Sequence, residues 1–574
     1  MLVVCNPCVE ERDVFLFSFR YYQRYFLSAI ALEKSWLRNW PDGVPQSLHY
    51  PTISLGEVLR RSASEAPDKI ALRYFSTKLT YKELDGFVDR FATALQDLGL
   101  NKGDRVVIYL PNIPQFVIAY YGTLRAGGVV VTCSPLYKER EFRHIVNDSG
   151  AKILVGWDRL YSYVRSVKDE TKLTSIMTTN DADYLNSQFS AGSVESYDCS
   201  GAQNMKNLLD KYDEEPKLVH IEPKDDLALL QYTGGTTGVP KGAMLTHCNL
   251  VANCVQFATW CKLRPEDVHL SILPLFHIYG MTVAMNVPIY TRSTMILVPD
   301  ARDTEAVVKV IDERRPTVFC GVPTMYVALL NRVDIRQHDL TSIRLCISGG
   351  APLPAEVQRR FEELTGGRLV EGYGLSETSP VTHVNPTDKP EKNRPGSIGI
   401  PISDTEARVV DLETGENDLP SGEPGELVIR GPQVMVGYWK KPEENRIALR
   451  DGWLYTGDIA TIDSDGYFRI VDRKKDMINV SGLKVWPREV EEILYEHSAI
   501  KEAAVIGVPD ERSGEAVKAY IVLKDGYIGK ITTEEIMKFC NEKIASYKAP
   551  KLIEFRSGLP KTPVGKILRR ALQM

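Results

Sequence analysis

The feature that most constrains this chain is a run of small and polar residues at 231–242, Gln-Tyr-Thr-Gly-Gly-Thr-Thr-Gly-Val-Pro-Lys-Gly. The apolar residues before it, at 227–232, predict a short buried strand, and residues 243–260 predict a helix. The run itself can bury little apolar surface, and its glycines make ordering it costly. Its chemistry suits a polyanion, because glycines let backbone N–H groups approach phosphate oxygens, hydroxyls donate, and Lys241 supplies a charge. We therefore expect a phosphate-binding loop here rather than a plain polar turn.

The spacing of this loop differs from that of a Walker A motif, in which Lys-Ser/Thr follows directly after Gly. Here Val239 and Pro240 separate Gly238 from Lys241, and Gly242 stands where the magnesium-binding hydroxyl would be. The sequence therefore disfavours a P-loop kinase or GTPase.

Length, charge and cysteine usage further narrow the class of protein that this chain can be. A chain of 574 residues should form more than one domain with an ample core. A net charge of −5 on this length implies no nucleic-acid partner. Of ten cysteines, only Cys5 and Cys8 form a CxxC pair, and no second pair completes a zinc site. Reduced, mostly buried thiols in a cytoplasmic protein are expected.

The sequence lacks an apolar run of the roughly 20 residues that a spanning helix needs. Residues 13–32 come closest, but Arg20 and Arg24 interrupt them. This stretch could lie on a membrane surface, which would make the protein weakly peripheral, or it could pack on the protein. A homo-oligomer is compatible with the sequence.

The order of predicted elements indicates an α/β fold. Strands and helices alternate from residue 54 to 155 and again from the loop to about residue 385, which is typical of parallel α/β sheets. From 396 short β-rich segments predict a small β subdomain, and 477–574 read as a small α+β domain. We expect an N-terminal extension at 1–34, a large multi-subdomain domain at 35–471, a charged hinge at 472–476 and a small C-terminal domain at 477–574.

Two Gly-rich turns follow predicted strands. The turn Ser348-Gly-Gly-Ala-Pro352 lies where doubly wound sheets bind ligands. In the segment 370–378, Val-Glu-Gly-Tyr-Gly-Leu-Ser-Glu-Thr, Tyr373 could stack on a base, and Glu377 is a hard oxygen ligand suited to phosphate-bound Mg²⁺. Taken alone, each segment is also compatible with a purely structural turn.

Four further polar residues are candidates for the same site. Asp458 ends the predicted turn 453–458 and could accept both ribose hydroxyls, and Arg473 could hold a ribose or a phosphate. Lys566, in the basic C-terminal segment 560–570, could stabilise charge that develops when a carboxylate attacks an α-phosphate. His277 lies between apolar residues, where a lone histidine is more often a core residue.

Together these stretches resemble the adenylate-forming superfamily in order and spacing, from about Trp36 to Leu572. The Phe-His context of His277 is similar to the acyl-CoA synthetase and fatty-acid–CoA ligase branch, whereas amino-acid-activating domains carry Phe-Asp there. The resemblance implies that ATP and Mg²⁺ convert a carboxylic acid, of medium or long chain, to an acyl-adenylate. Coenzyme A then releases AMP. An aryl-acid–CoA ligase, or an acyl-AMP ligase that loads a carrier protein, is the alternative, while a noncatalytic nucleotide- or lipid-binding scaffold is disfavoured by the intact motif residues.

The resemblance also assigns roles residue by residue, and it implies a small domain that rotates between the two steps. The assigned residues are Thr233, Gly234, Gly235, Thr236, Thr237, Gly238 and Lys241 in the phosphate loop; Gly349, Ala351 and Pro352 along the adenine; Gly372, Tyr373 and Gly374, with Tyr373 stacked on the adenine; Ser376 and Thr378 near the α-phosphate; Glu377 on Mg²⁺; Asp458 and Arg473 on the ribose; Lys475 at the hinge; Gly482 facing the site after rotation; and Lys566 and His277 as catalytic residues.

Three positions depart from the commonest pattern of the superfamily. Gly235 replaces a frequent Ser, so one phosphate donor must come from the backbone, and Ser376 replaces a frequent Thr. Asn479 stands where coumarate-type ligases and luciferases carry Lys, which weighs against a luciferase. We expect Tyr279, Met281 and residues 317–326 to shape the acyl pocket.

Overall fold

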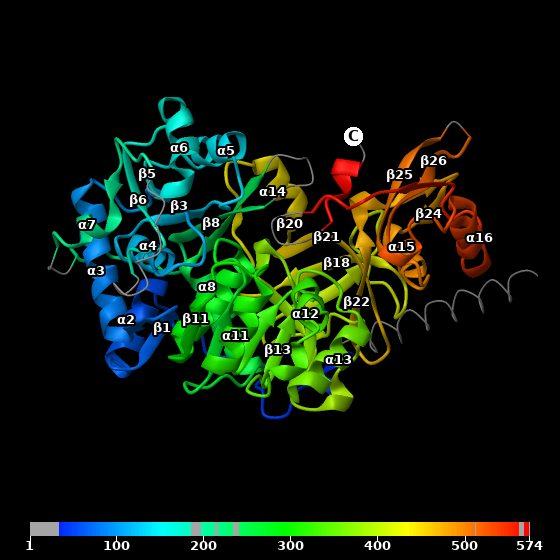
Figure 1. The fold of residues 1–574 in the computed structure, drawn as a ribbon, viewed down its shortest axis with the longest axis horizontal. Coiled ribbons are helices and arrows are strands. Elements are labelled where there is room, and N and C mark those ends of the chain that lie inside the picture. Colours follow the sequence, from blue (N-terminus) through cyan, green and yellow to red (C-terminus); the bar gives the residue numbers. More distant parts are fainter. Residues whose placement is uncertain are drawn as a thin grey trace, which may run out of the picture.

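The computed structural model describes residues 34–184, 197–212, 216–233, 240–510, 512–561 and 567–572. The predictions for the N-terminal extension before Lys34, for the loop residues Gly234, Gly235, Thr236, Thr237 and Gly238, and for Lys566 lie outside these residues. Within them, the chain forms two large sheets whose strands interleave along the sequence, a smaller antiparallel sheet and a C-terminal sheet (Figure 1).

The first large sheet, sheet 1, carries the predicted phosphate loop. Its strands from β8 to β7 run parallel, and β9 and β19 add an antiparallel edge. In spatial order the strands are β19 (Gly437–Tyr438), β9 (Lys241–Thr246), β8 (Leu227–Thr233), β4 (Val129–Thr132), β3 (Arg105–Tyr109), β5 (Ile153–Trp157), β6 (Ser175–Thr179) and β7 (Gln203–Asn204).

The prediction of a helix over 243–260 is wrong at its start. Lys241–Thr246 forms strand β9, antiparallel to β8, and helix α8 (His247–Trp260) begins only after it. Thr246 caps this helix in a capping box with Asn249, so the helix start is set there. The phosphate loop therefore joins two strands of a hairpin rather than a strand and a helix, and Thr233 pairs with Lys241 across its base.

The second large sheet, sheet 2, holds the two Gly-rich turns. Its six central strands run parallel and its outer strands antiparallel, so the prediction of parallel sheets holds for the centres of both sheets. The strands are β16 (Ile400–Pro401), β15 (Val381–Val384), β14 (Arg368–Gly374), β13 (Leu345–Ser348), β12 (Val318–Gly321), β10 (Val268–Ser271), β11 (Thr294–Leu297), β1 (Ile70–Tyr74) and β2 (Thr77–Thr80).

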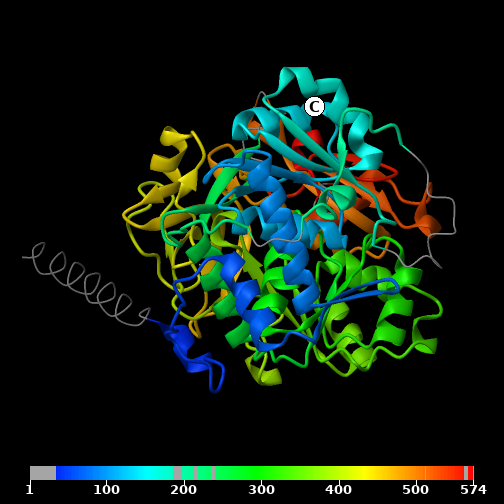
Figure 2. The ribbon, with the colours of Figure 1, turned by 90° about the vertical axis from the view of Figure 1, so that its left-hand side faces the viewer.

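One buried apolar cluster joins sheets 1 and 2. Helices α4 (Pro114–Arg125) and α8 are buried on almost all faces, as expected of helices that are apolar all round. Figure 2 shows the cyan part of sheet 1 above the green helices of sheet 2. The other helices of these layers are α2 (Leu55–Glu65), α3 (Tyr81–Asp97), α5 (Glu139–Ser149), α6 (Tyr161–Val167), α7 (Met205–Leu209), α9 (Ile278–Met281), α10 (Val287–Thr291), α11 (Thr304–Arg314), α12 (Pro323–Leu330) and α13 (Ala355–Thr365).

The predicted β subdomain and small C-terminal domain are both present. An antiparallel sheet, sheet 3, contains β17 (Glu406–Val410), β18 (Gly425–Arg430), β20 (Leu449–Arg450), β21 (Trp453–Ile462) and β22 (Phe468–Arg473), with α14 (Pro442–Ala448) beside it. The last sheet contains β23 (Ile478–Val480), β24 (Leu483–Val485), β25 (Ile500–Asp510), β26 (Gly514–Leu523) and β27 (Leu552–Phe555), flanked by α15 (Pro487–Tyr495) and α16 (Thr533–Lys543).

The predicted hinge at 472–476 begins inside strand β22, whose last two residues are Asp472 and Arg473. The rest of it, Lys474–Asp476, is a single 3-10 turn that leads into the small domain. In Figure 1 this domain lies to one side of the large part, in orange.

The described ranges hold neither a membrane-spanning helix nor a disulfide. Their helices are all too short or too polar to cross a membrane. Their cysteines are all free thiols, and most of them are buried.

Candidate active site

The predicted loops lie at the carboxyl ends of strands β8, β13 and β14, where open α/β sheets bind ligands. Two side chains tie these ends together. The Gln231 amide of β8 donates to the Phe276 carbonyl at 3.3 Å, next to His277. The Tyr279 hydroxyl donates to the Ile347 carbonyl of β13 at 2.9 Å. The structure thus connects the strand before the predicted phosphate loop, the His277 segment and the turn at residues 348–352, the predicted adenine turn.

Lys241 and Glu377 lie in one polar cluster, joined by Tyr438. The Lys241 ammonium pairs with Glu444 of α14 and lies 5.6 Å from the centre of the Tyr438 ring. The Tyr438 hydroxyl donates to Glu377 Oε1 at 2.7 Å. Tyr438 reaches this position because β19 pairs with β9, opposite Ala243. A cation and a hard carboxylate therefore flank the base of the predicted phosphate loop.

The predicted turn at Asp458 is instead a bulge in strand β21. Glu426 of β18 pairs with Ile459 and Val428 pairs with Tyr455, so residues 456–458 all lie opposite Leu427 alone. Gly457 adopts a φ of +69°, which favours glycine. Bulges next to functional sites re-aim side chains, and this bulge directs Asp458 toward β14 and β22.

Asp458 is held by a tyrosine and an arginine that were both predicted to bind nucleotide. Its Oδ2 accepts the Tyr373 hydroxyl at 2.5 Å, and its Oδ1 pairs with Arg473 Nε at 2.5 Å. The Asp458 side chain is 2% exposed whereas that of Arg473 is 42% exposed. The Asp458 charge raises the pKa of Arg473, and burial together with that charge raises the pKa of Tyr373. This arrangement fixes a buried carboxylate and leaves a partly exposed guanidinium beside it.

The two clusters share one neighbourhood. The charge of Glu377 contributes to the raised pKa of Arg473, and the charge of Arg473 in turn acts on Tyr438. Burial is the main reason that the pKa of Tyr438 is raised, so its phenol stays protonated and donates to Glu377. The structure therefore brings together Lys241, Glu377, Tyr373, Asp458 and Arg473.

The predicted adenine turn, residues 348–352, lies close to Tyr279. A Cβ placed on Gly349 would lie 3.0 Å from the Tyr279 ring, so glycine favours this close approach. Ala351 and Pro352 are exposed on the turn, and the next residue, Leu353, donates its backbone N–H to Glu371 Oε2 at 3.1 Å. Burial raises the pKa of the Glu371 carboxyl to about 7.

In the short 3-10 turn Ser376–Thr378, neighbouring residues differ in solvent exposure. Ser376 and Glu377 are partly exposed. Thr378 is fully buried, and its hydroxyl lies 2.5 Å from the Pro380 carbonyl and 3.1 Å from the Leu375 carbonyl. In this structure Thr378 shapes the turn, and its contact with an α-phosphate stays a prediction.

The glycines around Tyr373 have different surroundings. Gly372 is buried between β13 and β15, and a Cβ on Gly374 would come within 1.9 Å of the Pro380 carbonyl. Both positions therefore serve close packing of the backbone around Tyr373.

His277 is the N-cap of α9, and its Nδ1 accepts the Tyr279 N–H at 3.2 Å. Since Nδ1 accepts, a neutral ring carries its proton on Nε2. His277 thus begins the helix whose Tyr279 contacts the predicted adenine turn, and its catalytic role stays a prediction.

The donor set suits Mg²⁺ bound to phosphates rather than a protein-caged metal. The described residues contain no cluster of metal-binding side chains, so Glu377 would serve as a lone carboxylate ligand. Mg²⁺ in nucleotide sites takes one or two carboxylates and completes its shell with water and phosphate oxygens. Glu377, partly exposed and oriented by Tyr438, fits this chemistry.

Two assigned residues belong to the hinge and the small domain. Lys475 lies in the hinge 3-10 turn, and Gly482 is in the exposed β23–β24 hairpin with a φ of +85°. Their predicted roles, as hinge and as part of the second conformation, stay predictions.

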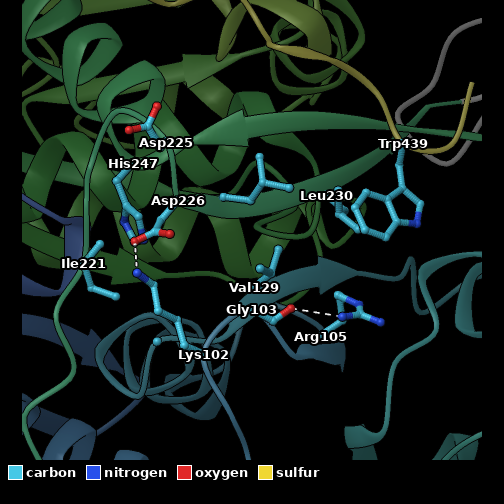
Figure 3. A pocket seen from close by; sticks show the side chains of 12 residues that line it. Lys102, Gly103, Arg105, Val129, Ile221, Asp225, Asp226, Leu230, His247 and Trp439 are labelled. Atoms are coloured by element: carbon cyan, nitrogen blue, oxygen red, sulfur yellow. Dashed lines mark hydrogen bonds and ion pairs between the residues drawn. The ribbon is translucent and has the colours of Figure 1, made fainter. Parts of the chain in front are cut away.

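A small cavity of about 130 Å³ lies at the opposite end of sheet 1 (Figure 3). Lys102, Asp226 and His247 line it, and Lys102 pairs with Asp226 at 2.6 Å. The cavity meets β8 at Leu227 and Leu230 and also reaches Trp439, but none of Lys241, Glu377 and Asp458 lines it. Its ion pair lies at Asp226, just before β8 begins, whereas the phosphate loop leaves β8 at Thr233. This cavity is therefore separate from the candidate active site.

Sequence reasoning missed Tyr438, Glu444 and Glu426, which hold Lys241, Glu377 and the Asp458 bulge. Tyr438 follows Gly437 in a Gly- and Pro-containing segment, and this aromatic could have been noticed. Glu444 and Glu426 carry no comparable signal, because each is an ordinary charged residue in a helix or a strand.

Comparison with known proteins identifies the family of the chain. The family model described as "AMP-binding enzyme" matches residues 59–439, and "AMP-binding enzyme C-terminal domain" matches residues 489–566. A long-chain-fatty-acid–CoA ligase of Bacillus subtilis (strain 168) is 46% identical over 557 residues, covering 94% of this chain and 98% of the relative. A ligase of the same description from Escherichia coli O6:H1 is 40% identical, with the same coverage. The crystal structure of ATP-bound MatB from Rhodopseudomonas palustris superposes with a TM-score of 0.81 at 31% identity, covering 91% of this chain and 98% of that one.

Proposed function

The chain belongs to the AMP-binding enzyme family, and on this premise we propose that it is an ATP-dependent fatty-acid–CoA ligase. The carboxylic acid is first joined to AMP with release of pyrophosphate. The thiol of coenzyme A then displaces AMP and forms the acyl-CoA. The observation that carries the proposal is the convergence of a cation, a hard carboxylate and a fixed carboxylate–guanidinium pair at the carboxyl ends of β8 and β14.

In the proposed complex the two polar clusters divide the nucleotide between them. Asp458 accepts the ribose hydroxyls and Arg473 lies along the ribose and α-phosphate, because the pair is already held in one geometry. Tyr373 presents its ring to the base while its hydroxyl stays on Asp458. Lys241 exchanges its Glu444 partner for the β- and γ-phosphates, together with the hydroxyls and N–H groups of the loop.

The resident cation is assigned to Glu377. When bound, Mg²⁺ supplies charge neutralisation between the phosphates. The contribution of the chain is to orient the Glu377 carboxylate through Tyr438 and to keep that phenol protonated.

In the adenylation step, a carboxylate oxygen of the fatty acid attacks the α-phosphorus, and the bond to pyrophosphate breaks. We assign Lys566 to the charge that develops on these oxygens, and His277 to the orientation of the carboxylate. In the second step the thiolate sulfur attacks the acyl carbonyl, and AMP leaves with the bonding electrons. A lysine that serves only the first step must give way to the thiol, which is why we infer a moving small domain joined at Lys475.

We infer a cytoplasmic protein that acts on small molecules, with weak peripheral association at a membrane where the fatty acid partitions. The acyl pocket is assigned to Tyr279, Met281 and residues 317–326. Of these, Tyr326 is fully buried and donates to the Phe319 and Ile347 carbonyls.

AMP release measured over a panel of carboxylates, with and without coenzyme A, tests the proposal. We expect turnover with medium- or long-chain fatty acids that depends on coenzyme A. Turnover confined to aryl acids would favour the aryl-acid ligase. AMP formation with a carrier protein but not with coenzyme A would favour the carrier-loading enzyme.

The variant Lys566→Ala separates the two steps. Acyl-adenylate formation should be lost, while thioester formation from supplied acyl-AMP and coenzyme A is largely kept. Full adenylation activity in this variant would contradict the assignment.

A further inference from the structure

A second carboxylate, Glu426 of β18, lies behind the Asp458–Arg473 pair. Its side chain is 7% exposed, and it binds two donors from two different segments. Its Oε1 accepts the Gly457 backbone N–H at 3.1 Å, and its Oε2 accepts Lys474 Nζ at 2.7 Å. Gly457 directly precedes Asp458, and Lys474 directly follows Arg473. One buried carboxylate therefore binds both flanks of the pair.

The bulge leaves a backbone donor that this carboxylate accepts. Residues 456–458 lie opposite a single residue of β18, so the Gly457 N–H has no ladder partner on that strand. Gly457 is partly exposed, and Glu426 gives its N–H a charged acceptor within the protein. The Thr456 hydroxyl fixes the other side of the bulge, since it donates to the Leu427 carbonyl at 2.7 Å and accepts the Asp458 N–H at 3.1 Å.

The second oxygen of Glu426 acts on the neighbouring strand. Asp458 pairs with Arg473 across β21 and β22, and Lys474 leaves β22 immediately afterwards. Because Lys474 is 44% exposed, its ammonium would be free to turn into solvent if the buried carboxylate did not hold it. Holding Lys474 at β18 restricts where the Arg473 backbone can go, and so keeps the guanidinium against Asp458.

We propose that Glu426 is a positioning residue that sets the geometry of the Asp458–Arg473 pair for the ribose of the nucleotide. The inference rests on the proposed function, since that function assigns ribose to this pair. Glu426 acts through Gly457 and Lys474 and need not touch the ligand.

The test compares AMP with 2′,3′-dideoxy-AMP, which lacks both ribose hydroxyls, by calorimetry on the full-length protein. Wild type should bind AMP at least about tenfold more tightly, because hydrogen bonds to a charged group are involved. In Glu426→Ala the affinity for AMP should fall about tenfold. The affinity for the dideoxy nucleotide should stay the same, so the preference for AMP disappears.

Two conservative variants separate the contributions of the two Glu426 carboxylate oxygens. Glu426→Gln keeps a carbonyl acceptor for Gly457 but loses the charge that pairs with Lys474, and Lys474→Met loses the same ion pair from the other side. Both should lower the preference for AMP by a similar, smaller factor, and the double variant should add nothing further. Glu406→Gln is the matched control, since Glu406 is exposed and pairs with Arg430 in the same sheet.

Equal weakening of both nucleotides in Glu426→Ala, or wild-type preference in that variant, would overturn the proposal. If Glu426→Ala does not fold, wild-type preference in both Glu426→Gln and Lys474→Met overturns it instead. A wild-type protein that does not distinguish the two nucleotides would remove the ribose assignment itself. Absence of AMP release over the carboxylate panel would refute the proposed ligase activity, and it leaves this binding comparison unaffected.

Discussion

Replacing Glu371 by Gln should stabilise the protein above neutral pH and much less in acid. Glu371 lies on β14 and is 6% exposed. It accepts at 3.1 Å the N–H of Leu353, the residue after the predicted adenine turn. Burial raises its pKa from 4.5 to about 7, against the opposing effects of that N–H and of Arg488 and Arg469. The native carboxyl therefore holds its proton over a pH range in which the unfolded chain has already lost it.

The sign and size of the effect follow from proton linkage. Between the unfolded pKa of 4.5 and the folded pKa of about 7 the native state binds more protons, so raising the pH lowers stability across this window. At about 1.4 kcal/mol per tenfold change, the loss is below about 1 kcal/mol at pH 5 and roughly 3 kcal/mol at pH 8. Glutamine does not titrate and keeps a carbonyl acceptor for Leu353. Its new N–H can use Ser348, the register partner of Glu371, whose buried hydroxyl has no hydrogen-bond partner among the described residues.

Thermal unfolding of wild type and Glu371→Gln at pH 5 and pH 8, at constant ionic strength, measures this difference. In a domain of this size about 1–2 °C corresponds to 1 kcal/mol, so we expect a gain of several degrees at pH 8 and little at pH 5. Glu363→Gln, on the exposed face of α13, is the control and should show no such dependence. An equal gain at both pH values, or a loss at pH 8, would refute the reasoning.

Three further substitutions test packing, buried charge and the phosphate loop. Gly374→Ala should lower the free energy of unfolding by at least about 2 kcal/mol in urea, because its Cβ would lie 1.9 Å from the Pro380 carbonyl. Asp85→Asn should cost about 3 kcal/mol in the same assay, because Arg125, 9% exposed, would lose a carboxylate held at 2.5 Å. Lys241→Met should raise KM for ATP about tenfold or more in ATP–pyrophosphate exchange, through loss of a charge-assisted contact to phosphate.

Each of these has a contradicting result. Gly86→Ala, in α3 with nothing within 4 Å of the new Cβ, should gain about 0.5–1 kcal/mol, and a similar gain at Gly374 would contradict the steric argument. Unchanged stability in Asp85→Asn would show that Asp89 alone neutralises Arg125. An unchanged KM for ATP in Lys241→Met would separate this lysine from the phosphates.

The sequence by itself determined the features that depend on neighbouring residues. Ser54 and Thr80 cap helices α2 and α3, and each cap is a hydrogen bond to the backbone three residues ahead, which depends on local sequence alone. The alternation of apolar strands and helices identified the α/β class, and the Gly-rich turns fall at the carboxyl ends of strands. Membership of the family followed from the motifs in order.

Only the tertiary structure decided the features that depend on strand pairing. The segment 241–246 is a strand because β8 and β19 offer it partners on both sides, and nothing in its own composition distinguishes it from the first turn of a helix. Asp458 lies on a bulge because β18 opposes three residues with one. Glu426, Tyr438 and Glu444 lie 31, 61 and 203 residues along the chain from the site residues that they contact, Gly457, Glu377 and Lys241. Tertiary packing sets strand register and side-chain contacts across such separations. It therefore brings into the site residues that no local sequence pattern marks as functional.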